Sequence, residues 1–478
     1  MSKLELEKTL ELSDLTHAFI YKDLIRPSIA NAFCYTLQQM PVAFTIYFLE
    51  QTQNQLHVAT FGVGTIFYQA FGFSAMNGLA SGLQALASQA IGAQKFQFCG
   101  KLYYQSIFIA CILIIPISII LYSSEDIMLF MKIDSELAEA TGLLNKGMIS
   151  VILLEGIFAQ TKAFLNAQNL YHLSVYTHFA SCFLSLIFNY FFISILEMQL
   201  MGGIIARNLL ELSNNLIIIY LIKKFDCCKQ TLIKFDWSLL DGTFKFFKTA
   251  LPIGCIFWYE SICFELFQIQ VNYLASLLLS LNVLMYTVAL IAYQFSYGIS
   301  IAATTFAGNA MGAKSVKLAK QYTIGSFVLF GGFQILCLAL IICYQQEIVQ
   351  FLTSEVEMEV LFIKFLPVLL IQIVTDGVQA LVSGIVKVIG KEHFASKSMM
   401  FCYIVFGQPT AYLLTYVWDF ELAGVWWGMI VAASTYSLLQ IYIMLKSDWH
   451  HLSNEINDKI HSMGAHHADT ELQLLEKA

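Results

Sequence analysis

Charged side chains are scarce in this sequence. They make up 12% of its 478 residues, against the roughly 25% that soluble domains carry. Hydrophobic residues make up 58% of the chain. A chain with so little charge and so much apolar surface is not expected to fold as a soluble protein, and the composition predicts a membrane protein.

Several functional motifs are absent as well. No Gly-x-x-x-x-Gly-Lys-Ser/Thr phosphate loop is present, so no nucleotide site of that kind is expected. No Asp-x-x-x-Asp pair occurs, and His172 and His178 lie near one helix end. The first 25 residues mix basic and acidic side chains without an apolar core, which argues against a cleaved signal peptide.

The 11 cysteines show no repeated metal-ligand spacing. Most lie in apolar segments, where core packing is their expected role, so we expect no metal site. Cys227 and Cys228 differ, because they lie in a basic loop at the end of an apolar segment. These two cysteines could be reversibly acylated. We favour the interpretation that both are unmodified.

The apolar residues form continuous runs rather than alternating ones, which favours membrane-spanning helices over a β-barrel. About 20 apolar residues cross the hydrocarbon as a helix, and about twelve segments reach that length. The expected spans are Pro27–Glu50, His57–Ile91, Leu102–Tyr122, Gly142–Phe164, Val175–Leu196, Gly202–Ile222, Thr249–Tyr273, Leu277–Met311, Tyr322–Tyr344, Val360–Val388, Ser398–Trp418 and Gly424–Leu445.

The sequence repeats itself at a shift of about 220 residues, which divides it into two halves. Gly78–Ala93 aligns with Gly298–Ala313 without a gap. We therefore expect an all-α integral membrane protein with two six-helix lobes related by a pseudo-two-fold axis along the membrane normal. The expected parts are an N-terminal segment 1–25, an N-lobe 26–222, a linker 223–248, a C-lobe 249–445 and a C-terminal tail 446–478.

Lysines and acids occupy alternate connections between the spans. Lys223, Lys224 and Lys229 lie in one such lysine-rich loop, whereas Glu355 and Glu357 lie in an acidic one. By the positive-inside rule the lysine loops are cytoplasmic, and an even number of spans places both termini there. The basic patches thus mark topology and not nucleic-acid binding. The plasma membrane and a vacuolar or lysosomal membrane both remain open.

Two carboxylates lie within the apolar and aromatic segment Pro252–Gln270, at Glu260 and Glu265. Lipid offers an ionised carboxylate no hydrogen bond, so each should face a wet cavity, face a partner charge or hold a proton. A helix turns about 100° per residue, which sets the two acids about 140° apart around the axis. Either the cavity is wide, the helix is bent near its beginning, or one acid only supports the other. Alternatively, each glutamate has a purely structural role, in which its protonated side chain forms a hydrogen bond between helices.

The segment Gly78–Ala93 resembles the signature of the multidrug and toxic compound extrusion (MATE) family. Leu251-Pro252, followed by Glu260 and Glu265, resembles the Leu-Pro and Glu-x-x-x-x-Glu of the eukaryotic branch. Asp376–Gly384 resembles the acidic segment of that branch's tenth helix. The resemblance implies a proton-coupled exporter with a cavity between two lobes.

The resemblance also implies that Glu260, Glu265 and Asp376 are counterparts of the family's essential carboxylates. Two departures qualify it. The Arg usual in the eighth helix is replaced at Phe306, and the first-helix Asp of many prokaryotic members corresponds to Thr45. These departures move the expected coupling to the C-lobe.

Four more side chains are expected to line the substrate cavity, together with Glu260 and Glu265. They are Trp258, Tyr293, Gln379 and Gln69. Aromatic faces attract organic cations by roughly 0.5–2 kcal/mol each. Packing against helices or lipid is the alternative for each aromatic side chain.

Other charges within the spans are expected to be structural. Arg207 and Glu211 lie four residues apart on the sixth span and can neutralise each other. Glu155 and Lys162 lie two turns apart on one face of the fourth span, which favours a pair or an anchor at the helix end.

The sequence therefore predicts a proton-coupled antiporter that exports organic cations, drugs or metabolites by alternating access. It needs no cofactor, because the proton gradient supplies the energy. The expected partners are a small cationic molecule and the bilayer, and the chain is expected to be a monomer. One alternative is a lipid or lipid-linked-sugar flippase of the same fold, whose cavity would be expected to carry basic residues. The other is a membrane-embedded transferase, which would require an embedded His or an Asp-x-x-x-Asp pair.

Overall fold

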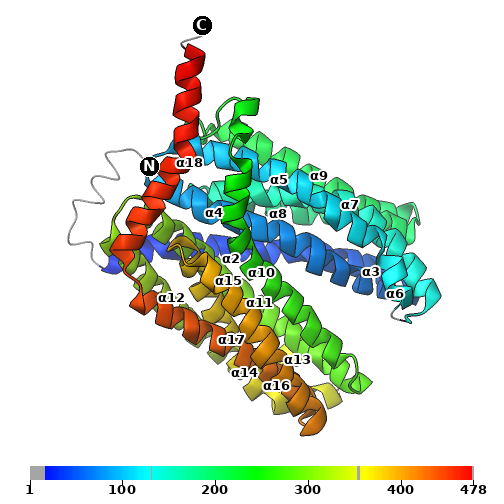
Figure 1. The fold of residues 1–478 in the computed structure, drawn as a ribbon. Helices are drawn as coiled ribbons and strands as arrows, with labels where there is room; N and C mark the ends of the chain where they lie inside the picture. Colours follow the sequence, from blue (N-terminus) through cyan, green and yellow to red (C-terminus); the bar gives the residue numbers. More distant parts are fainter. Residues whose placement is uncertain (1–16, 131, 353–355, 476–478) are drawn as a thin grey trace. The chain divides into compact units, whose positions relative to one another are not determined.

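The computed structural model describes residues 17–130, 132–352 and 356–475, and helices make up nearly all of this part of the chain (Figure 1). All the expected spans are found, most of them longer than predicted. They are α2 (His17–Glu50); α3 (Gln55–Phe67), η1 (Tyr68–Phe73) and α4 (Ser74–Gly92) in one span; α5 (Phe96–Tyr122); α7 (Ser135–Ala167); α8 (Tyr171–Asn189) with η2 (Tyr190–Ile195); α9 (Gln199–Phe225); α10 (Thr243–Val271); α11 (Ser276–Gly312); α12 (Val316–Cys343); α14 (Val356–Val388); α15 (Glu392–Phe401), η4 (Cys402–Gly407), α16 (Gln408–Tyr412) and η5 (Leu413–Val417) in one span; and α17 (Glu421–Lys446).

Within the described residues, 9 of these helices are long and apolar enough to cross a membrane as single units. The remaining spans are α2 and the two that π-helical turns divide, at η1 and at η4 and η5. The chain is therefore a multi-pass membrane protein with the expected twelve spans. π-Helical turns are rare and often mark functional positions, which makes η1 a segment of interest.

Four helical elements were not predicted from the sequence. They are α6 (Ser124–Phe130), the 3-10 turn η3 (Trp237–Leu240), α13 (Gln345–Leu352) and α18 (Trp449–Leu475). All four lie in segments too polar or too short to read as spans, which is why hydropathy did not identify them.

The described chain forms two compact units. The C-unit holds the chain up to Phe33 together with Ile262–Asn457, and the N-unit holds Cys34–Ser261 together with the chain from Asp458 onward. The chain passes from one unit to the other inside α2, α10 and α18, not in the loops. Glu260 therefore belongs to the N-unit and Glu265 to the C-unit, although both lie on α10.

The sequence repeat is also visible in the backbone. Gln94 and Lys314 follow α4 and α11 with φ of 60° and 58°, and Asn169 and Gly390 follow α7 and α14 with φ of 62° and 80°. A left-handed residue just after a helix is a common way to end it. Equivalent helices of the two halves therefore end in the same conformation.

Glycines of the repeated element allow close helix crossings within each unit. In the N-unit, a Cβ at Gly78 of α4 would lie 2.7 Å from the Gly254 carbonyl oxygen of α10. In the C-unit, a Cβ at Gly298 of α11 would lie 2.7 Å from the Ser28 carbonyl oxygen of α2. Small residues permit such backbone contact in lipid. Gly78 joins the repeated element of the first half to α10, the first span of the second half, and Gly298 joins the repeated element of the second half to α2, the first span of the first half.

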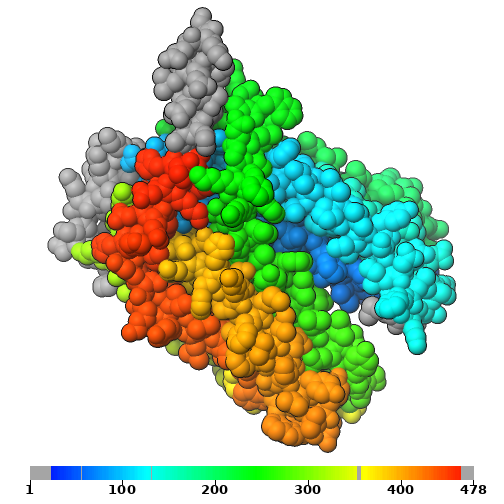
Figure 2. Space-filling model, in the orientation of Figure 1, coloured from blue at the N-terminus to red at the C-terminus, as the bar shows by residue number. Residues whose placement is uncertain are grey.

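Helix α5, drawn in light blue in the space-filling view (Figure 2), has exposed apolar side chains along one face. Ile112, Ile115 and Ile119 are 48%, 60% and 64% exposed there. Apolar side chains exposed at this spacing along one helix face are the expected lining of a lipid-facing surface.

The linker between the halves is folded against α5. The Thr231 carbonyl oxygen occupies the space beside Gly100, and the Tyr104 hydroxyl donates to the Ile233 carbonyl at 2.9 Å. The Gln105 amide donates to the carbonyls of Leu239 and Asp241. The linker is thus an ordered part of the N-unit.

Candidate functional site

Two of the three predicted coupling carboxylates come together in the C-unit. Glu265 lies on α10 and Asp376 on α14, and both are half-buried. Each interacts electrostatically with the phenol of Tyr286, which α11 supplies. Three helices thus place two acids of like charge within electrostatic range of one phenol. No salt bridge involves Glu265 in the part of the chain that the structure describes.

Two predicted substrate residues lie in the same unit. Tyr293 is seven residues after Tyr286 on α11, and its ring stacks on that of Tyr297 with centroids 5.7 Å apart. Gln379 is three residues after Asp376 on α14 and is fully buried, and its amide oxygen accepts a hydrogen bond of 2.9 Å from the Tyr403 hydroxyl. Tyr293 therefore lies two helical turns from Tyr286, and Gln379 lies about one turn from Asp376. Gln379 also has a packing role.

The other predicted residues lie in the N-unit. Trp258 and Glu260 are on α10 and Gln69 is on η1, and all three are half-buried. The Trp258 indole nitrogen donates to the Ala70 carbonyl at 3.1 Å, and its ring stacks on that of Tyr259 at 5.8 Å. The Trp258 and Gln69 segments are therefore held together by a direct hydrogen bond.

A buried charged cluster in the N-unit joins residues that the sequence treated as two separate pairs. Arg207 lies 3.6 Å from Glu211, as predicted, and also 3.8 Å from Glu155. Glu155 does not bond Lys162 directly. Instead, Gln38 donates to Glu155 at 3.4 Å and accepts from Lys162 at 2.7 Å. We call these five residues and Tyr68 the N-unit cluster.

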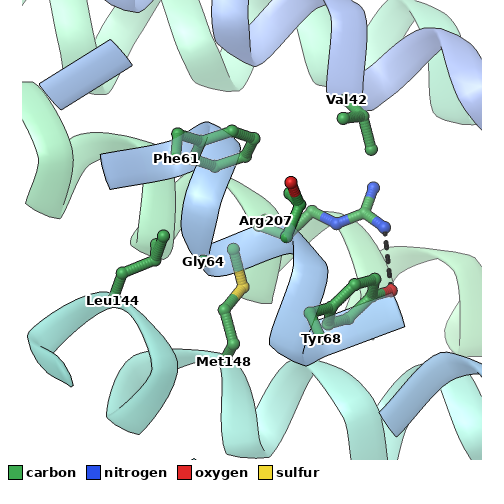
Figure 3. A pocket seen from close by; sticks show the side chains of 8 residues that line it. Val42, Phe61, Gly64, Tyr68, Leu144, Met148 and Arg207 are labelled. Carbon is green, nitrogen blue, oxygen red and sulfur yellow. Dashed lines mark hydrogen bonds between the residues drawn. The ribbon is translucent and has the colours of Figure 1, made fainter. Parts of the chain in front are cut away.

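Tyr68 is the polar residue of this cluster on η1. Its hydroxyl donates to the Glu155 carboxylate and accepts from Arg207 at 3.3 Å. A small cavity opens beside it, with Val42, Phe61 and Met148 among its apolar walls (Figure 3). The Arg207 guanidinium reaches past these walls to the Tyr68 hydroxyl, as the dashed line in Figure 3 shows.

The cysteine pair of the linker has an unreactive member. Burial and the neighbouring Cys227 raise the pKa of the Cys228 thiol to about 12. A thiol that stays protonated is a poor nucleophile, which supports the unmodified interpretation for Cys228. Among the described residues, no group of three or more His, Cys, Asp or Glu side chains is arranged to hold a metal ion.

The internal repeat of the fold corresponds to two copies of a known family domain. The model of the MatE family matches residues 27–191 and again residues 252–413. The chain belongs to the MatE family. Its members are multidrug and toxic compound extrusion transporters, so this protein is a membrane transporter of small molecules and not an enzyme.

Relatives of this MATE protein support the eukaryotic-type branch. It is 23% identical over 402 residues to Protein DETOXIFICATION 36 of Arabidopsis thaliana, covering 83% of this chain and 79% of the relative. It is 24% identical over 438 residues to Protein DETOXIFICATION 17 of Arabidopsis thaliana, covering 90% and 89%. The crystal structure of the eukaryotic MATE transporter AtDTX14 shares the fold with a TM-score of 0.86 at 21% identity, covering 93% of this chain and 99% of that one.

The sequence did not identify two residues that are central to these sites. Tyr286 precedes Tyr293 by two helical turns and Tyr297 by about three on α11, so a face of spaced tyrosines was available as a signal. Tyr68 gave no such signal, because the π-helical turn at η1 changes the helical periodicity there.

Proposed function

We propose that this MATE transporter is a proton-coupled antiporter that exports organic cations, with Glu265 and Asp376 exchanging protons for cargo. The observation that supports it best is the meeting of these two carboxylates at Tyr286 on α11. Two ionised carboxylates near one phenol repel each other, and binding of either a proton or a cationic cargo relieves that repulsion.

Competition for the same negative charge couples the two fluxes. Cargo from the cytoplasm occupies the deprotonated site, and protons from the opposite side displace it there. Each ligand shifts the equilibrium between the inward-open and outward-open states by its differential affinity for them. Glu260, the third predicted coupling carboxylate, lies on the N-unit half of α10. No cofactor is needed in this scheme, because the proton gradient supplies the energy.

The same chemistry selects the cargo. Tyr293 offers an aromatic face near the acids, and such faces contribute roughly 0.5–2 kcal/mol to binding an organic cation. A lipid phosphate would instead need an available cation. Arg207 lies 3.8 Å from Glu155 and 3.6 Å from Glu211, so its charge is already compensated. This balance disfavours the flippase alternative.

The topology of the proposal follows from the loops. Lysine-rich connections lie on the cytoplasmic side with both termini, and the acidic connections lie on the side from which protons enter. The membrane is the plasma membrane or an acidified internal membrane, and the transporter acts as a monomer. Either membrane presents the acidic compartment on the far side from the cytoplasm.

The test uses the purified full chain in proteoliposomes with an imposed pH gradient. The probes are ethidium, a planar aromatic cation, and carboxyfluorescein, an anion of similar size. We expect ethidium to accumulate in the acidic compartment and carboxyfluorescein not to. Transport of ethidium driven equally by a sodium gradient at uniform pH would contradict proton coupling, and transport of only the anion would contradict the cargo class.

A further inference from the structure

The N-unit cluster contains four buried ionisable side chains that the proposed mechanism does not use. Glu155, Lys162, Arg207 and Glu211 are all at most 6% exposed. The two acids and two bases balance in charge. Three groups, the Tyr68 hydroxyl, Gln38 and Arg207, contact the Glu155 carboxyl. Cys34 and His178 lie within electrostatic range of Lys162, but neither replaces these contacts.

Removing any charged member would leave an uncompensated buried charge, so the cluster is held as a unit. Asn214 fixes the second acid, because its amide donates to Glu211 at 3.1 Å. Lys162 also lies 4.0 Å from the centre of the Tyr35 ring. The cluster is thus a rigid framework spread over α2, α7, α9 and η1.

The framework reaches α10 through a single π-helical turn. Tyr68 opens η1 and is bound to the cluster, and two residues later the Ala70 carbonyl accepts from the Trp258 indole at 3.1 Å. Gln69 lies between them. Phe73 closes the turn and packs near Phe257 of α10, with ring centroids 6.5 Å apart. Every contact in this path lies within the N-unit.

We propose that the N-unit cluster is a positioning site, which fixes η1 and through it sets the placement of Gln69 and Trp258, the N-unit candidates for substrate contact. Tyr68 is its key positioning residue, because its hydroxyl joins η1 to both Glu155 and Arg207. The inference rests on the proposed function for the role of Gln69 and Trp258 in binding cargo, but the path from the cluster to α10 does not depend on proton coupling.

The test compares Tyr68→Phe with Tyr104→Phe in the purified full chain. Tyr104 is a matched control, because its hydroxyl also donates one hydrogen bond, to the Ile233 carbonyl, in the same unit. Binding of ethidium is measured by fluorescence anisotropy without any gradient. We expect Tyr68→Phe to raise the Kd for ethidium by about 2- to 30-fold, the range seen when a coupling residue is altered, and Tyr104→Phe to leave it unchanged.

A double-mutant cycle tests the route. If Tyr68 acts in part through Trp258, the losses caused by Tyr68→Phe and Trp258→Phe are less than additive in the double variant. Additive losses would overturn the proposal. Binding is measured without a gradient, so this result does not depend on proton coupling. A failure of the positioning role can therefore be distinguished from a failure of proton coupling.

Amide hydrogen exchange provides a readout that needs no cargo. We expect Tyr68→Phe to speed exchange in residues 68–75 and also in residues 254–260, while Tyr104→Phe speeds it in neither. Faster exchange in residues 68–75 with no change in residues 254–260 would overturn the proposal even if ethidium does not bind to the wild-type protein.

Discussion

The C-unit and the N-unit each contain two acids at the meeting point of several helices, but the acids have different partners. In the C-unit, Glu265 and Asp376 share the phenol of Tyr286, and no salt bridge of Glu265 occurs in the described chain. In the N-unit, Glu155 and Glu211 share Arg207. The N-unit acids are thus held against a cation, whereas Glu265 forms no ion pair within the described residues. On the proposed mechanism, proton exchange belongs to the C-unit and the N-unit provides a fixed framework.

The largest expected effect is on transport, in Glu265→Gln. The amide keeps the size of the side chain but cannot exchange a proton. We expect pH-gradient-driven uptake of ethidium to fall by about 100-fold or more, as when a proton-transferring side chain is lost. Initial uptake rates in proteoliposomes measure it. Glu357→Gln, the same change at an exposed acid at the start of α14, should transport like the wild type, and equal loss in both variants would count against a special role for Glu265.

The next largest effect is on stability, in Arg207→Gln. Removing the cation leaves Glu155 and Glu211 buried without compensation, which should lower the free energy of unfolding by about 3–5 kcal/mol. Denaturant titration in detergent micelles measures this.

Two companion variants sharpen this second prediction. Lys146→Gln breaks a half-exposed pair with Glu125 at 3.1 Å and should cost at most about 1 kcal/mol. Glu265→Gln should be at least as stable as the wild type, because it removes a charge without an ion pair. An Arg207→Gln protein as stable as the Lys146→Gln protein would show that the N-unit cluster is not a framework.

Smaller and equal effects are expected at the two glycine crossings. Gly78→Ala and Gly298→Ala each place a Cβ against the backbone of another helix, so each should destabilise its unit by about 1–3 kcal/mol. Gly331→Ala on α12 meets no atom within 4 Å and should be neutral or slightly stabilising. Thermal unfolding of the three variants in one detergent ranks their stabilities. A loss of stability at only one of the two crossings would show that the two halves do not pack equivalently there.

The smallest expected effect is in Tyr286→Phe, which keeps the ring and removes the hydroxyl that Glu265 and Asp376 approach. We expect the uptake rate to fall by about 2- to 10-fold, the effect of one hydrogen-bonding group. Tyr416→Phe is the control, because its hydroxyl donates to the Gln270 carbonyl in the same unit. When uptake is measured between pH 6 and pH 8, we expect its pH dependence to differ from that of the wild type in Tyr286→Phe and not in Tyr416→Phe. The same change in both variants would show that Tyr286 is not part of the coupling site.

Hydropathy and the repeat were enough to predict the spans. The isolated carboxylates in one apolar segment predicted Glu265 as a candidate site residue, whereas Asp376 was predicted from the family resemblance. Both signals are local in the sequence, because lipid requires long apolar helices and penalises isolated charges. The same reasoning identified the Arg207–Glu211 pair, which is four residues apart on one helix.

Contacts between helices could not be predicted in this way. Glu155 bonds Tyr68 and Gln38 from other helices, and Lys162, its predicted partner, reaches it only through Gln38. Which side chains meet there depends on helix rotation, and the π-helical turn at η1 alters that rotation. The passage of the chain between units inside α10 also left no mark in the sequence, because the helix is continuous across it.

Proton release on cargo binding tests the central claim most directly. Ethidium is added to the purified protein in detergent at pH 7 with a pH indicator in place of buffer. The account predicts that the wild type and Glu357→Gln release about one proton for each ethidium bound, and that Glu265→Gln binds ethidium with little or no release. Equal proton release from Glu265→Gln and the wild type would contradict it.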